Sequence, residues 1–89
     1  MPQNQAQQSF GFMDKKAMLL DHLATAERHV ERGREIVARQ RAIVRELARD
    51  GHDTTSAVDL LQLFEQLQDL HIADRDRLRW ELKAIDQLK

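Results

Sequence analysis

Four histidines are the side chains best suited to do chemistry in this chain, which contains no cysteine for a thiolate site. Helical bundles hold metals with histidines and carboxylates on facing helices, usually as Glu-x-x-His pairs. The sequence has no such pair, and the nearest equivalent is His71 followed by Asp74. We therefore predict no metal site and no cofactor, and we favour a structural role for these residues.

Gly33, His29, His71 and Asp74 are predicted to form a polar layer in the core. Folding the chain about residue 52 places Gly33 opposite His71, with His29 near Asp74. A glycine inside a helix costs about 1 kcal/mol relative to alanine, so making room for the imidazole is a physical reason for it. Such layers fix register or oligomeric state. A pH-responsive assembly is the alternative, because histidine titrates near neutrality. Gln40 and Gln68 extend the layer.

Neither a nucleophile-base arrangement, a glycine-rich phosphate loop nor a pair of carboxylates at catalytic spacing is found in the sequence. We therefore predict that the protein is not an enzyme. Two other sets of residues remain as binding candidates. Trp80 and Ile72 lie off the main apolar face, and aromatic residues are common in binding hot spots, so they are candidates for a protein contact. Arg41, Arg45 and Arg49 are candidates for binding phosphates.

The elements that position these residues are two long helices. The sequence predicts a polar, disordered tail over residues 1–13 and a helical hairpin over 14–89, with Asp14 capping the first helix. The helices are expected at about 15–49 and 55–89, joined by a turn at 50–54. Gly51 suits the left-handed position that ends a helix, and Asp53 or Thr54 can cap the next one.

Apolar residues recur at helical spacing in both segments. In the first helix they alternate spacings of four and three, which predicts a continuous seam of Leu19, Leu23, Ala26, Val30, Gly33, Val37, Gln40, Val44 and Leu47. In the second helix Phe64, His71, Leu78 and Ile85 repeat every seven residues. Further apolar columns flank them, comprising Leu60, Leu67 and Leu88 on one side and Leu61 and Leu82 on the other. Stripes this wide indicate more than one neighbour, so we predict a homodimeric four-helix bundle.

Charge and hydropathy limit the classes of partner. Residues 14–49 carry nine Lys/Arg and six Asp/Glu, a net +3, whereas residues 50–89 carry five and nine, a net −4. The overall charge of −1 is unlike that of a nucleic-acid coat protein. Without a signal peptide or an apolar run of about 20 residues, the chain is expected to be cytoplasmic, with no membrane contact.

Short segments of the chain resemble a group of short, uncharacterised α-proteobacterial proteins. They include Ala26–Val30, Ala38–Arg41, Gly51–Thr54 and His71–Leu78, within residues 19 to 85. The resemblance implies a recurring hairpin and supplies no activity. The topology also resembles the Rop-type bundle, but without matching residues no RNA-binding role is implied.

The sequence thus predicts a non-enzymatic module for protein–protein interaction or regulation that self-associates through its helical seams and binds an unknown protein partner. The alternative is a small nucleic-acid-associated regulator that uses the first-helix arginines.

Overall fold

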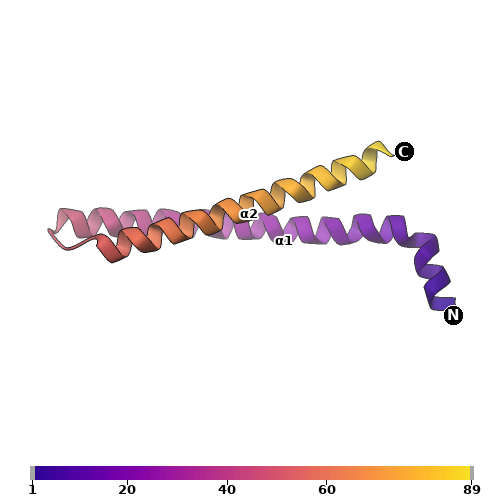
Figure 1. Ribbon diagram of the computed structural model, residues 1–89, viewed down its shortest axis with the longest axis horizontal. Coiled ribbons are helices and arrows are strands. Elements are labelled where there is room, and N and C mark those ends of the chain that lie inside the picture. The colour runs from indigo at the N-terminus through magenta and orange to yellow at the C-terminus, as the bar shows by residue number, and fades with distance from the viewer. Residues whose placement is uncertain (1, 89) are drawn as a thin grey trace.

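The computed structural model describes the backbone of residues 2–88 and the side chains of residues 14–88. Two helices, α1 (Pro2–Arg49) and α2 (Thr55–Gln87), make up this part of the chain and pack against each other. Figure 1 shows the hairpin, with the loop at one end and both termini toward the other. The predicted all-helical hairpin is confirmed. Neither described helix has a stretch apolar enough to cross a membrane.

The start of α1 differs from the prediction. The backbone is helical from Pro2, upstream of the expected start near residue 15, so Asp14 lies inside the helix and does not cap it. Proline is tolerated in the first helical turn, and the glutamines and alanine that follow it are good helix formers. The side chains of residues 1–13 lie outside the described residues, so the predicted role of this segment as a separate polar tail stays a prediction.

The loop is built as the sequence predicts. Gly51 has a φ of 76°, the left-handed conformation that glycine adopts without strain. The backbone N–H of His52 donates to the carbonyl of Leu47 at 2.9 Å, and that of Gly51 donates to Ala48 at 3.2 Å, which together make a Schellman motif. Thr54 is the N-cap residue of α2, and its side chain makes no capping hydrogen bond. Asp53, one residue earlier, supplies the cap instead, because its Oδ1 accepts hydrogen bonds from the backbone N–H and the hydroxyl of Thr55.

The predicted α1 seam is confirmed at every position. Its nine residues are all buried or half-buried. The α2 seam contains the predicted central column and only one of its two predicted flanks, the one with Leu61 and Leu82. Its members are Ala57, Leu61, Phe64, Gln68, His71, Arg75, Leu78, Leu82 and Ile85. Leu60, Leu67 and Leu88, which the sequence also predicts to flank this seam, are exposed. The hairpin therefore covers one side of the wide α2 stripe and leaves the other uncovered.

The buried core is concentrated away from the loop. Leu19, Ala26, Leu78, Leu82 and Ile85 form one buried cluster, with Leu23 packed against it. Nearer the loop, the seam residues Val44, Leu61 and Phe64 are only half-buried. We call residues 33–70 the loop half and residues 14–32 with 71–88 the terminal half. The terminal half completes its own core, and the loop half does not.

Candidate interaction surface

One edge of the α1–α2 contact is closed by ion pairs. Arg41 of α1 contacts Glu65 of α2 at 2.9 Å, and Arg79 of α2 contacts Glu27 of α1 at 3.2 Å. Lys16 and Asp86 form a further interhelical pair at 2.9 Å near the chain ends. We call the side with these pairs the ion-pair edge. Exposed pairs add little stability individually, but they leave this edge polar and internally neutralised.

The opposite edge, which we call the open edge, is apolar in the loop half. Its apolar residues are Ile36 and Ile43 from α1 with Leu60 and Leu67 from α2, all exposed, and the half-buried Phe64 between them. Arg32 and Arg39 of α1 also border this edge. Two adjoining hollows follow this edge. The more enclosed one has a cavity volume of about 130 Å³. Ile36 and Phe64 line both hollows, which makes them one groove.

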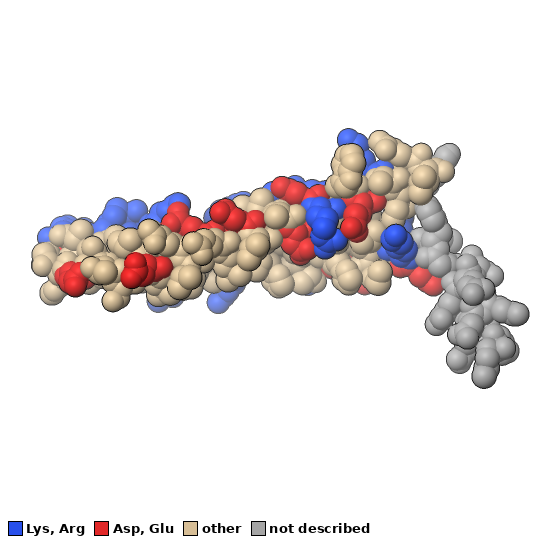
Figure 2. Space-filling view, viewed as in Figure 1, with Lys and Arg blue, Asp and Glu red and all other residues tan. Residues whose placement is uncertain are grey.

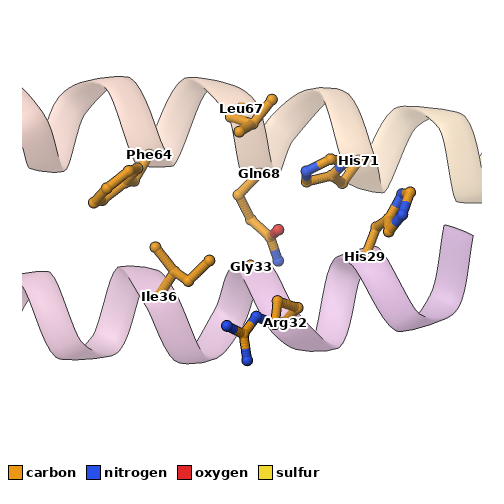
Figure 3. A pocket seen from close by; sticks show the side chains of 8 residues that line it. All are labelled: His29, Arg32, Gly33, Ile36, Phe64, Leu67, Gln68 and His71. Carbon is orange, nitrogen blue, oxygen red and sulfur yellow. The ribbon is translucent and has the colours of Figure 1, made fainter.

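Figure 3 shows that both helices contribute to the enclosed hollow: Phe64, Leu67, Gln68 and His71 belong to α2, and the remaining lining residues belong to α1. Elsewhere on the hairpin surface, Figure 2 shows charged residues gathered over the terminal half of the visible face and mostly uncharged surface over the loop half. Large exposed apolar patches are uncommon on monomeric proteins and usually mark contact surfaces.

Gly33 makes room for Gln68, whereas the sequence predicts His71 at this place. A Cβ added to Gly33 would overlap the side-chain amide of Gln68. That amide reaches across the helix interface, and its Nε2 donates to the carbonyl of Val30 at 2.8 Å. The prediction that glycine makes room for a bulky neighbour is thus confirmed, but the predicted neighbour, His71, is wrong. The actual seam places Gln68 in the same column as Leu61 and Leu82, a column the sequence could have revealed.

A second glutamine makes the reciprocal contact. Gln40 of α1 is only 6% exposed, and its Nε2 donates to the backbone carbonyl of Ala57 in α2 at 3.0 Å. Each helix therefore sends one glutamine amide to the backbone of the other. The Oε1 of Gln68 is buried and lacks a hydrogen-bond partner among the described residues. The sequence predicts these two glutamines only as an extension of the polar layer. In the structure they are the central members of that layer.

The histidine pair forms, but without the predicted acid and not as a buried layer, because His29 is exposed and His71 is half-buried. The rings of His29 and His71 lie with their centroids 5.3 Å apart, tilted by 52°, at the terminal end of the groove. Asp74 is exposed and pairs with Arg77 of its own helix at 2.8 Å, so its place in a core layer is wrong. Among the described residues, no group of three or more histidine, aspartate or glutamate side chains is arranged to hold a metal ion.

The other candidate residues lie apart from the groove. Trp80 is 68% exposed, as expected for a residue on the back of α2. Ile72 is half-buried in the same column as Glu65 and Arg79, which places it at the ion-pair edge. Arg41 is paired with Glu65, and Arg49 lies 3.9 Å from Asp50. Arg45 is exposed.

Comparison of this chain with protein-family models, with curated proteins and with solved structures finds no match. The resemblance to the α-proteobacterial group therefore stays a prediction.

Proposed function

We propose that this protein is a non-enzymatic protein–protein interaction module that self-associates by covering the open edge of one hairpin with that of a second copy. The observation that carries the proposal is the contrast between the two edges. Ion pairs neutralise one, whereas the other exposes Ile36, Ile43, Leu60 and Leu67 along a single groove. A four-helix bundle would give these side chains the apolar neighbours that two helices cannot supply.

A second copy fits this groove because the incompletely buried apolar side chains extend along the whole loop half. The half-buried seam residues and the exposed open-edge residues occupy the same stretch of both helices, so one partner of similar length would cover both. A chain of 89 residues also buries a comparatively small fraction of its surface alone, and association is a common remedy. The proposed assembly is a homodimer.

The test uses two leucines of matched exposure on opposite edges. Leu67 on the open edge is 50% exposed, and Leu20 near the ion-pair edge is 49% exposed. Leu67→Glu would place a carboxylate in the dimer interface, where its desolvation is costly. Leu20→Glu would leave that interface intact. We expect sedimentation at micromolar concentration to show a dimer for the natural chain and for Leu20→Glu, and a helical monomer for Leu67→Glu.

A natural chain that stays monomeric and helical under these conditions would contradict the proposal, as would dissociation of both variants alike. The nucleic-acid alternative has less support, because Arg41 and Arg49 each lie beside a carboxylate. It predicts affinity for DNA or RNA that falls steeply with salt and is lost when Arg41, Arg45 and Arg49 are neutralised.

A further inference from the structure

The open edge changes character along its length. In the loop half it presents isoleucines from α1 and leucines from α2. In the terminal half the same columns continue as Lys15, His22 and His29 on α1 and as Asp74, Glu81 and the exposed terminal Leu88 on α2. The edge therefore has a direction: it is apolar near the loop, and near the termini it carries histidines on one helix and carboxylates on the other. This direction restricts how a second copy can lie on it.

Two symmetric arrangements bring two open edges face to face. With both loops at the same end, α1 of each copy lies on α2 of the other, and each loop half covers the other loop half. With the loops at opposite ends, α1 lies on α1 and α2 on α2. Full overlap in that second arrangement places the apolar half of each copy on the polar half of the other, at a cost in desolvation.

Charge favours the same arrangement as the apolar pattern. Residues 14–49 carry a net +3 and residues 50–89 a net −4. Placing α1 on α2 of the second copy brings opposite net charges together. Placing like helices together brings net positive against net positive and net negative against net negative, which costs free energy and disfavours that orientation.

We propose that the second copy docks with its loop at the same end, so that α1 of each hairpin packs on α2 of the other. The inference rests on the proposed self-association and specifies its geometry. In this arrangement the two His29–His71 pairs lie at one level of the bundle, at the boundary between its apolar and polar halves.

The absence of native cysteine allows single spin labels to test the arrangement. We would label His52→Cys in the loop and, separately, Lys83→Cys in the exposed terminal part of α2, and measure distances between copies by pulsed electron resonance. With neighbouring helices about 10 Å apart, loops at the same end predict distances below roughly 30 Å at both sites, including the label arms. Sedimentation of each labelled variant checks that it still dimerises.

An arrangement with the loops at opposite ends predicts different distances between the labels. The helical rise of about 1.5 Å per residue then separates the Lys83→Cys labels by roughly 40 Å along the bundle in a fully overlapped dimer, and by more if only the loop halves overlap. A dimer with such a long distance would overturn the proposed arrangement while leaving self-association intact. A chain that forms no dimer at all would overturn both, so the two failures are distinguishable.

Discussion

The contact between Gly33 and Gln68 shows how one missing methyl group sets the packing of two helices. The Gln68 amide occupies the space that a Cβ at position 33 would take, and from there it reaches the Val30 carbonyl. An alanine at position 33 would gain helix propensity but would push the amide away from that carbonyl. Two effects of similar size therefore oppose each other at this residue.

We predict that Gly33→Ala is neutral or destabilising in the natural chain and stabilises a Gln68→Ala variant by about 1 kcal/mol, the difference in helix propensity. The coupling in the double-mutant cycle should be about 1 kcal/mol or more, because the two side chains compete for one space. Urea denaturation of the four proteins, monitored by circular dichroism, measures it. Additive effects within about 0.3 kcal/mol would show that the two positions do not interact.

At the scale of the element, the start of α2 depends on one carboxylate. The hydrogen bonds from the backbone N–H and the hydroxyl of Thr55 lower the pKa of Asp53 below its ordinary value of 3.8. A lowered pKa in the folded state means that this group stabilises the fold above the unfolded-state pKa. That contribution is lost as the pH falls through the lowered folded-state pKa.

We predict that Asp53→Ala lowers the melting temperature at pH 7 and that this difference shrinks at an acid pH below the lowered folded-state pKa of Asp53, where the natural carboxylate is protonated. Asp53→Asn keeps an acceptor oxygen without a charge, so it should retain much of the cap and show less dependence on acid pH. Thermal melts by circular dichroism at the two pH values make the comparison. An Asp53→Ala deficit that is equally large at both values would assign the cap to something other than the charged carboxylate.

The helices and loop could be predicted from the sequence because they depend on local signals. Gly51, Asp53 and the spacing of the nine α1 seam residues act within a few positions along the chain, and the structure agrees with each of them. The choice between Leu60 and Gln68 at the α2 seam is different. Hydrophobicity favours the leucine, but the register that gives Gln68 the space at Gly33 turns Leu60 outward. That choice depends on both helices at once.

At the scale of the whole molecule, the two halves of the hairpin differ in how complete they are. Leu19, Leu78 and Ile85 are buried without any partner chain, whereas Ile43 and Leu60 remain exposed. Local stability follows the local density of buried apolar contacts, so the halves should open with different free energies. Association through the open edge would add contacts to the less complete half.

We predict that hydrogen exchange resolves the two halves. On dilution below the dimer dissociation constant, amides of residues 36–47 and 57–70 should lose protection, while those near the terminal core, at 19–30 and 78–85, should change little. Leu67→Glu should show the same uneven protection at all concentrations, with Leu20→Glu as the control. Uniform loss along both helices would contradict the division into halves.

The position of the core also has a consequence for the rate of folding. A hairpin that is packed best beside its turn can begin folding with contacts between residues close in sequence. Here Leu19 and Ile85 of the core cluster are separated by most of the chain. Such contacts require a long loop to close before they stabilise anything, which raises contact order and slows folding. During synthesis we expect α1 to have no packed neighbour until residues 78–85 have left the ribosome.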